Sequence, residues 1–379
     1  MKPLRLAGIL AAAAISGAAA SGFSDFNAGI NARNDRNGND VVRFMSRALA
    51  APDLPQHLRA TALHDRATAY VELKQPDLAI ADYTGALALV PDDYNSLIER
   101  GALYGEKKQY DAARADFAAA IKRRPDLLAG YASHAEANLD EKKYDEALKD
   151  YNDGLVVSPA DPDLIVLRGE ALRMAGRYDE AIKDFTYVVD NHSRYTAAHI
   201  LRARTYQQSG KTHAAVSDYE DAIDLEPDNL GLRETAGIAQ WADGSYREAT
   251  RNFTRSAADP KLAAFSYLWL YLTALKRRSS ADDFTQNAPK LDLASWPGPI
   301  VKLFLGQAAP DDVFAAAKQG EADAQKDRVC EADFFVAEWQ LSRSDAASAR
   351  SLLSDAAAAC RDELPESFIS RTELARLGP

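Results

Sequence analysis

The chain has 379 residues, of which 47% are hydrophobic and 27% are charged, a composition typical of a folded protein and unlike that of a disordered or low-complexity chain. Its 45 basic and 56 acidic side chains give a formal net charge of −11 at pH 7. Because a chain of this charge repels the phosphate backbone, the composition argues against a nucleic-acid-binding protein.

The first 20 residues are typical of a secretory signal peptide. Lys2 and Arg5 form a basic start, an apolar stretch follows, and residues 18–20 supply the small side chains of a cleavage site. The apolar stretch is too short to span a bilayer as a helix, so we expect no integral membrane span. No cysteine precedes position 330, which predicts that the chain carries no lipid anchor. We therefore expect a periplasmic or secreted protein.

Between the signal peptide and the first regular pattern lie two short segments. Residues 21–40 are rich in Asn, Gly and Asp, and we expect a flexible N-terminal segment there. A helical pattern begins at Val41, and a turn punctuated by Pro55 follows it. We interpret residues 41–59 as an N-terminal half-repeat that caps the array described next.

From residue 60 to residue 263 the sequence repeats every 34 residues. Near the end of five of the six units stands a proline or, in one unit, a serine: Pro91, Pro125, Pro159, Ser193 and Pro227. In all six units an alanine is followed four residues later by an aromatic residue. The alanines are Ala79, Ala113, Ala147, Ala181, Ala215 and Ala249, and the aromatics are Tyr83, Phe117, Tyr151, Phe185, Tyr219 and Phe253. This spacing predicts a second helix with a small residue and an aromatic on one face, ended by proline.

The pattern resembles that of the tetratricopeptide repeat (TPR) family. The small residue of the family's first helix is matched by Ala67, Gly101, Ala135, Gly169, Ala203 and Gly237. The resemblance implies an all-α solenoid of helix-turn-helix pairs wound into a right-handed superhelix, with stacked units that share one core. The units would be 60–93, 94–127, 128–161, 162–195, 196–229 and 230–263.

A charged pattern shares the same period. Arg66, Arg100, Arg168 and Arg202 precede the small residue, with His134 in the remaining position, and Asp82, Asp116, Asp150, Asp184 and Asp218 precede the aromatic. We interpret these residues as a ladder of Arg–Asp contacts that joins the two helices of a pair. The alternative is a charged stripe that recognises a ligand.

Beyond residue 263 the strict repeat stops, but helical patterning continues over 264–379. The apolar stretch 263–275 is too short to cross a membrane, so we expect a core helix. Residues 328–360 return to the pattern of a helical hairpin, with Leu353 at the aromatic position, which predicts a degenerate repeat. A last helix over 366–377 is expected to complete a degenerate helical C-terminal cap.

The repeats together with the segments FSYLWLYL, IVKLFLG and CEADFFVAEWQLSRSD resemble the NlpI-type periplasmic TPR proteins. That resemblance implies a scaffold that brings envelope proteases and peptidoglycan hydrolases together. The chain departs from those proteins because it lacks their lipid-bearing cysteine and has more repeats.

The chain has two cysteines, Cys330 and Cys360, which we expect at the start and the end of the last hairpin. These two ends lie side by side in an antiparallel helix pair, within reach of a disulfide. Because the export signal directs the chain to an oxidising compartment, we predict a Cys330–Cys360 bridge. The alternative is two unrelated buried cysteines.

No motif points to catalysis. The six histidines share no metal-ligand spacing, and HExxH, paired CxxC and GxSxG patterns are absent from the sequence. The Gly210-Lys211-Thr212 tripeptide resembles the end of a phosphate-binding loop, but Thr205 stands where that pattern requires glycine. We therefore predict no enzyme, no catalytic residue, no metal and no cofactor.

In TPR arrays a partner binds in the concave groove lined by the first helix of each unit. The resemblance places these residues in that groove: Ile98, Leu139, Val166, Glu170, Arg173, Met174, Ile200, Arg204, Ile238 and Trp241. Acidic residues outnumber basic ones at the lining positions, so we expect partner segments with basic or apolar side chains; the alternative is that the acids only keep this face soluble.

Fold and groove together do not identify the partner. We expect an exported scaffold or adaptor for envelope enzymes, and the sequence is also compatible with a homodimer. Two other functions stay open: a periplasmic assembly chaperone for outer-membrane or secretion machinery, and an envelope hydrolase with a catalytic C-terminal third.

Overall fold

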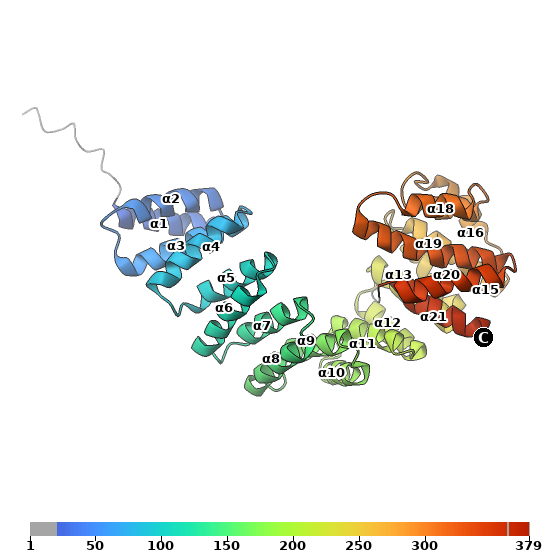
Figure 1. Ribbon diagram of the computed structural model, residues 1–379, viewed down its shortest axis with the longest axis horizontal. Coiled ribbons are helices and arrows are strands. Elements are labelled where there is room, and N and C mark those ends of the chain that lie inside the picture. Colours follow the sequence, from blue (N-terminus) through green and yellow to red (C-terminus); the bar gives the residue numbers. More distant parts are fainter. Residues whose placement is uncertain (1–20, 362–363, 379) are drawn as a thin grey trace, which may run out of the picture. The chain divides into compact units, whose positions relative to one another are not determined.

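The computed structural model describes residues 21–361 and 364–378 (Figure 1). The signal peptide predicted at 1–20 lies outside the described residues. In the described part every regular element is a helix. The chain divides into two compact units, one ending at residue 171 and the other beginning at residue 172, and each is described by itself.

The first unit opens with a helical hairpin. Helices α1 (Gly22–Asn34) and α2 (Gly38–Ala50) pack against each other and enclose a small core that includes Phe26 and Met45. A Cβ atom at Gly29 would stand 2.7 Å from the Cε atom of Met45, so the two helices approach closely at this glycine.

The prediction of a flexible segment at 21–40 is therefore wrong. Ser21 caps α1, because its hydroxyl accepts a hydrogen bond from the backbone N–H of Ser24 at 3.1 Å. Asn37 caps α2 in the same way through the N–H of Asp40. Residues 41–59 are correspondingly not a half-repeat, since α2 is the second helix of a complete hairpin.

Helix-turn-helix pairs with the predicted 34-residue spacing follow the hairpin. In the first unit they are α3 (Gln56–Glu72) with α4 (Pro76–Leu89), α5 (Tyr94–Glu106) with α6 (Tyr110–Arg123), and α7 (Leu128–Asp140) with α8 (Tyr144–Val157). The boundary between the units falls within α9 (Pro162–Met174), and α10 (Tyr178–Asn191) follows. In the second unit the pairs are α11 (Thr196–Gln208) with α12 (Thr212–Leu225), and α13 (Leu230–Asp243) with α14 (Tyr246–Ser256). These pairs confirm the predicted all-α repeat fold.

The turn inside each pair needs a left-handed residue at one fixed place. Positive φ angles recur every 34 residues, at Lys74, Lys108, Lys142, Gly176, Gly210 and Gly244. The last three are glycines, which adopt this conformation without steric cost, whereas the lysines adopt it at some cost. Gly210 of the tripeptide that resembled a phosphate-binding loop thus has this turn-forming role.

The predicted Arg–Asp ladder is present where the structure gives its geometry. Arg100 donates from Nε and Nη2 to the two carboxylate oxygens of Asp116 at 2.8 and 2.7 Å. The same bidentate pairs join Arg66 to Asp82 and Arg202 to Asp218. The Nη1 atom of Arg100 also donates to Thr84 on the preceding helix, at 3.0 Å. Each such arginine therefore connects the two helices of its own pair and reaches the helix before it.

The second unit ends in a helical region that is folded against the last repeat pair. Its elements are α15 (Ala263–Arg277), α16 (Asp282–Asn287), η1 (Ala288–Lys290), α17 (Gly298–Phe304), α18 (Pro310–Ala317), α19 (Ala322–Ser342), α20 (Ala346–Ala359) and α21 (Pro365–Leu377). Helix α15 is the expected core helix, since the Trp269 ring stacks on Phe253 of α14 and contacts Phe334 and Phe335 of α19. Across residues 21–361 and 364–378, no helix is both long and apolar enough to cross a lipid bilayer.

The predicted disulfide is confirmed. Cys330 and Cys360 are bonded, and their Cα atoms are 5.4 Å apart. Cys330 lies inside α19, which begins at Ala322 rather than at the cysteine, and Cys360 follows the last residue of α20. The bond therefore joins the middle of one helix to the end of its antiparallel partner.

Candidate functional site

The ten residues predicted to line a partner-binding groove are divided between the two units. Ile98, Leu139, Val166 and Glu170 belong to the first unit, where Val166 is buried and the other three are partly buried. Arg173, Met174, Ile200, Arg204, Ile238 and Trp241 belong to the second unit.

Trp241 does not line a groove, and that assignment is wrong. Its side chain is fully buried, with its ring centroid 5.3 Å from that of Trp269 and 6.3 Å from that of Phe334. The Nζ atom of Lys276 lies 4.9 Å from the Trp241 ring centroid. The groove position that a repeat array would leave open on α13 is covered here by the helices that follow the last repeat.

Three of the other predicted residues meet at one cavity of the second unit. Arg173 at the end of α9, Arg204 on α11 and Ile238 on α13 come from three successive repeats and line a cavity of about 200 Å³. We call this the inner-face cavity. Its remaining lining residues are Gln207, Gln208, Tyr219, Thr235, Leu364, Pro365 and Phe368.

Hydrogen bonds fix the polar wall of the inner-face cavity. The Nη1 atom of Arg173 donates to Oε1 of Gln208 at 2.9 Å, and the Tyr219 hydroxyl donates to Oε1 of Gln207 at 2.7 Å. Burial raises the pKa of Tyr219, and Arg204 beside its hydroxyl opposes that rise. Tyr219 therefore stays a neutral hydroxyl at any physiological pH, and the charge at this wall comes from the arginines.

The apolar wall of the cavity comes from a part of the chain that the repeat pattern did not reach. Leu364, Pro365 and Phe368 stand at the start of α21, which packs on α20 and contacts α13. No residue spacing in the sequence relates Phe368 to Ile238, so sequence reasoning missed this half of the site. Met174 and Ile200 do not line the cavity: Met174 is exposed, and Ile200 packs partly buried against the core of the α11–α13 repeats.

Comparison with known proteins supports the repeat assignment directly. Family models described as tetratricopeptide repeat match residues 64–127, 132–196 and 196–229. The repeats of this chain are tetratricopeptide repeats. TPR repeats form scaffolds for protein interactions, so these repeats support a protein-binding role for the chain in this general sense.

Solved structures show the same TPR fold. A tetratricopeptide repeat protein from Parabacteroides merdae is 19% identical, with a TM-score of 0.51 over 62% of this chain and 92% of that one. The C-terminal part of a TPR repeat-containing protein from Cytophaga hutchinsonii is 17% identical, with a TM-score of 0.52 over 62% of this chain and 94% of that one. Such low identities establish the fold alone.

A second cavity, with a volume of about 330 Å³, lies in the first of the two compact units. Arg33, His57, His64 and Asp65 are among its lining residues. The Nη1 atom of Arg33 already donates to the Asp65 carboxylate at 2.7 Å, so this cation is offset by an acid of the same wall. Among the residues that the structure describes, those that line the inner-face cavity include no aspartate and no glutamate.

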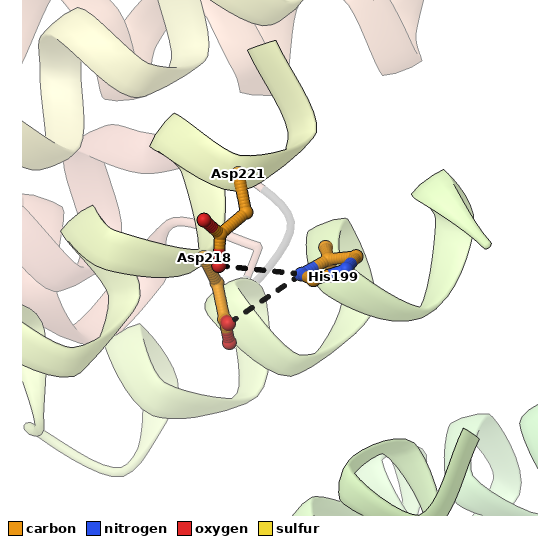
Figure 2. Close-up of side chains that lie close together, drawn as sticks. All are labelled: His199, Asp218 and Asp221. Carbon is orange, nitrogen blue, oxygen red and sulfur yellow. Dashed lines mark ion pairs between the residues drawn. The ribbon is translucent and has the colours of Figure 1, made fainter. Parts of the chain in front are cut away.

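One side-chain cluster has the composition of a metal site. His199 on α11 points toward two carboxylates of α12, and its Nδ1 atom lies 3.8 Å from an oxygen of Asp218 and 3.8 Å from one of Asp221 (Figure 2). Arg202, however, donates to both oxygens of Asp218 and offsets its charge. Only Asp221 would bring an uncompensated negative charge to a cation, so we assign no metal to this cluster.

The other ring nitrogen of His199 explains why a histidine stands here. Nε2 lies 3.2 Å from the backbone oxygen of Ser193, six residues earlier. At the equivalent, fourth position of their units, Tyr131 donates to the carbonyl of Pro125 and Arg233 to that of Pro227, again six residues earlier. The hydrogen bonds of these side chains therefore connect the start of one repeat to the end of the preceding repeat.

Proposed function

We propose that this chain is an exported TPR scaffold that holds a segment of a partner protein at the inner-face cavity of its second unit. The observation that carries the proposal is the convergence of Arg173, Arg204 and Ile238 on one cavity from three successive repeats. TPR proteins bind peptides on the inner helices of the array, and these three residues stand at the predicted inner positions. A cavity that combines charged and apolar walls suits a protein segment, because the polar groups of the segment can bond to the charged wall while its apolar side chains pack on the apolar wall.

The disulfide supports export. Cys330 and Cys360 form a bond that persists in oxidising compartments and is rare in the cytosol. The signal-peptide pattern at 1–20 points in the same direction. We therefore propose that the chain acts in the periplasm or outside the cell.

The partner class that we propose is the envelope protease or peptidoglycan hydrolase, as the resemblance to NlpI-type proteins implies. In such a role the scaffold performs no chemistry itself. It binds an enzyme and raises the effective concentration of that enzyme near its client.

Site-specific photocrosslinking in living cells tests this proposal. A photoreactive residue replaces Met174, beside the cavity residue Arg173, or Tyr187 on α10, which does not line the cavity. Both side chains are 42% exposed, so the two positions are matched in accessibility. We expect crosslinks to an envelope enzyme from position 174 and few or none from position 187.

Three results would speak against the proposal. Crosslinks from position 187 alone would place binding elsewhere on the repeats. An outer-membrane or secretion protein crosslinked at 174 would favour an assembly chaperone. A second copy of the chain crosslinked at 174 would show that this face serves a homodimer.

A further inference from the structure

We propose that the docking of helix α21 against α13 assembles the inner-face cavity, and that protons control this docking. The proposal rests on the function proposed above, since it names how the binding site of that scaffold is regulated. Helix α21 stays docked while the carboxyl groups at its first turn are protonated, and it is released when they ionise.

The inner-face cavity is complete only while α21 is docked. Leu364, Pro365 and Phe368, at the start of α21, line the cavity together with Ile238 of α13. Helix α21 packs on α20 and also contacts α19 and α13. Release of its first turn would therefore remove the apolar wall, and a partner segment would lose that side of the site.

The buried face of α21 is largely polar. Its buried residues are Glu366, Ser367, Ile369, Ser370 and Glu373, of which Ile369 alone is apolar. A helix that docks on a core usually buries a continuous apolar stripe, because apolar burial supplies most of the free energy of docking. The docking of α21 therefore depends more than usual on how well its polar groups are paired.

Three polar atoms near the start of α21 are buried without a hydrogen-bond partner among the residues that the structure describes. They are Oε2 of Glu366, a residue that is 4% exposed, and the Oγ atoms of the fully buried Ser367 and Ser370. Each atom gives up its hydrogen bonds to water when the helix docks. We therefore expect the first two turns of α21 to be released more easily than the rest of the helix.

Acidic groups surround Glu366 from the neighbouring helices. Within the described ranges, the charged groups that act on it are Glu331 and Asp327 from α19 and Glu234 from α13. Arg361, which follows α20, donates to both carboxylate oxygens of Asp327. Burial and the neighbouring acids raise the pKa of Glu366 to about 8. The N–H groups at the start of α21 favour the anion and oppose this rise without cancelling it.

The two neighbouring carboxyl groups are partly buried and have one hydrogen-bond donor each. Trp296 donates from Nε1 to Oε2 of Glu331 at 2.5 Å, and the Ser266 hydroxyl donates to Oε1 of Glu234 at 2.8 Å. Burial nevertheless raises the pKa of each carboxyl to about 7. The other charged groups that act on this pair are Asp327, Arg328 and Asp259. As the pH rises, negative charge therefore accumulates on three sides of the first turn of α21.

The carboxylate of Glu373, near the other end of α21, faces cations instead. Lys276 donates from Nζ to Oε2 of Glu373 at 2.7 Å, and the same Nζ lies 3.5 Å from an oxygen of Glu338. Arg376 donates from Nη1 to Glu373 and from Nη2 to the carbonyl of Ala242 in α13, the latter at 2.5 Å. Negative charge at this end has cationic partners, so release begins at the first turn.

Linkage gives the direction of the switch. In the released helix these carboxyl groups return to an ordinary pKa of about 4.5, whereas in the docked helix the pKa values are about 7 to 8. Their contribution to docking is therefore fully present below the lower value and is lost as the pH rises through the higher ones. Each group raises the released fraction by up to about 10-fold per pH unit in between.

Hydrogen exchange measured by mass spectrometry tests the switch on the mature, disulfide-bonded chain at about pH 5.5 and about pH 8.5. Protection factors, corrected for the intrinsic effect of pH on exchange, report the released fraction of each helix. We expect protection of the α21 amides to fall by about 10-fold or more between the two pH values. At the higher pH, α21 should also be less protected than α19. Helices α5 and α6 of the first unit should keep their protection.

Two substitutions separate the charge from the packing. E366Q replaces the carboxyl with a neutral amide, so α21 should keep most of its protection at about pH 8.5. D228N, at an exposed aspartate, should behave like the wild type. S370A removes a buried hydroxyl without a partner, so it should raise protection of α21 at both pH values and leave the pH-dependent fall in place.

A second readout follows the cavity wall itself. With 4-fluorophenylalanine placed at position 368 alone, the fluorine NMR resonance should move toward that of the unfolded chain between about pH 5.5 and about pH 8.5. The same label in E366Q should keep its docked resonance. A label that stays docked in the wild type at the higher pH overturns the proposal.

Three exchange results also overturn it: constant protection of α21 in the wild type, an equal fall in E366Q, or equal protection of α21 and α19 at the higher pH, which would mean that the whole unit opens together. The scaffold proposal fails separately, because hydrogen exchange requires no partner. Crosslinks at position 174 without release of α21 keep the scaffold and remove the switch, whereas release of α21 without crosslinks keeps the switch and removes the scaffold.

Discussion

The ring of Phe117 occupies the space that a side chain at Gly101 would need: a Cβ atom at position 101 would stand 2.6 Å from Cε1 of that ring. Gly237 and Phe253 have the same relationship, at 2.7 Å. Tyrosine accompanies alanine at the equivalent places. The Ala–Tyr pairs are Ala67 with Tyr83, Ala135 with Tyr151, and Ala203 with Tyr219, and they alternate along the chain with the Gly–Phe pairs, of which Gly169 with Phe185 is the third.

The tyrosine hydroxyl has its own partner in two of these pairs. Tyr83 bonds to Thr68 at 3.0 Å, and Tyr219 donates to Gln207 at 2.7 Å. A phenylalanine has no such hydrogen bond and packs onto the bare glycine instead. The array therefore uses two packing solutions for one position, and each couples the size of the first-helix residue to the identity of the ring.

This coupling predicts the effect of Gly101→Ala. The added methyl group must displace the Phe117 ring, so we expect the free energy of unfolding to fall by about 1–3 kcal/mol. Gly105→Ala is the matched control in the same helix, because nothing lies within 4 Å of a Cβ at position 105. Alanine is the better helix former, so G105A should stabilise the chain by up to ~1 kcal/mol. Urea denaturation followed by circular dichroism measures both; equal effects of the two substitutions would contradict the packing argument.

The double substitution G101A/F117Y tests whether the two solutions are interchangeable. The pair then has the residues found at positions 67 and 83, so we expect it to lose less stability than the sum of the single substitutions. A coupling free energy of zero, measured by the same urea denaturation, would mean that the alternation has no energetic basis.

The sequence predicts the TPR array well because its period repeats every constraint six times. The small residue, the aromatic and the left-handed turn recur at fixed places, so a single irregular residue does not hide them. The hairpin α1–α2 escaped prediction for the opposite reason. Its first helix buries Gly22, Asp25, Phe26, Gly29 and Ala32, a set without a continuous apolar stripe, and it has no counterpart elsewhere in the chain.

The candidate site was only half predictable. Arg173, Arg204 and Ile238 follow from the repeat register, because the register fixes which face of the first helix each residue occupies. The positions of Phe368 and Trp241 depend instead on how the non-repeating C-terminal helices fold back onto α13. No sequence period contains that long-range contact, so the register left Phe368 out and placed Trp241 in an open groove.

The Arg–Asp ladder predicts that a buried Arg–Asp pair contributes more to the stability of the chain than an exposed one. The Arg100 and Asp116 side chains are 17% and 9% exposed, whereas those of the surface pair Arg123 and Asp92 are 56% and 58% exposed. Lysine cannot make the bidentate contact, and a buried carboxylate that loses a hydrogen bond is costly. We expect R100K to destabilise the chain by about 1–3 kcal/mol and R123K by less than ~0.5 kcal/mol in urea denaturation. Comparable losses would mean that the ladder contributes no more than a surface ion pair.

Removal of the disulfide should loosen the second unit selectively. The Cys330–Cys360 bond spans 30 residues of sequence, and the chain-entropy estimate for such a loop is about 3–4 kcal/mol. All four tryptophans of the chain belong to the second unit, so their fluorescence reports the unfolding of that unit alone. We expect C330S/C360S to lower its unfolding midpoint and to weaken binding at the inner-face cavity. Reduced wild-type protein should behave like the C330S/C360S variant. If the variant were as stable as the oxidised wild-type protein, the bond would have no structural effect.

One buried carboxyl group, that of Glu366, and two partly buried ones, those of Glu331 and Glu234, predict how the stability of the second unit depends on pH. Burial raises the pKa of Glu366 to about 8, and the neighbouring Glu331 and Glu234 add to that rise. Burial also raises the pKa values of Glu331 and Glu234 themselves, each to about 7. The folded unit thus keeps these groups protonated at a pH where the unfolded chain, with a pKa near 4.5, has released the protons.

The direction of the effect follows from linkage. A carboxyl with a raised folded-state pKa contributes stability that is fully present below its unfolded pKa and is lost as the pH rises through its folded pKa. We therefore expect the tryptophan-reported stability to fall between pH 5 and pH 8, by up to about 1.4 kcal/mol per pH unit for each group. E366Q mimics the protonated form, so it should match the wild type near pH 5 and exceed it at pH 9. D228N, at an exposed aspartate, should follow the wild-type curve throughout. A wild-type stability that rises between pH 5 and pH 8, or an E366Q variant that loses stability as steeply as the wild type, would show that Glu366 is ionised in the folded protein.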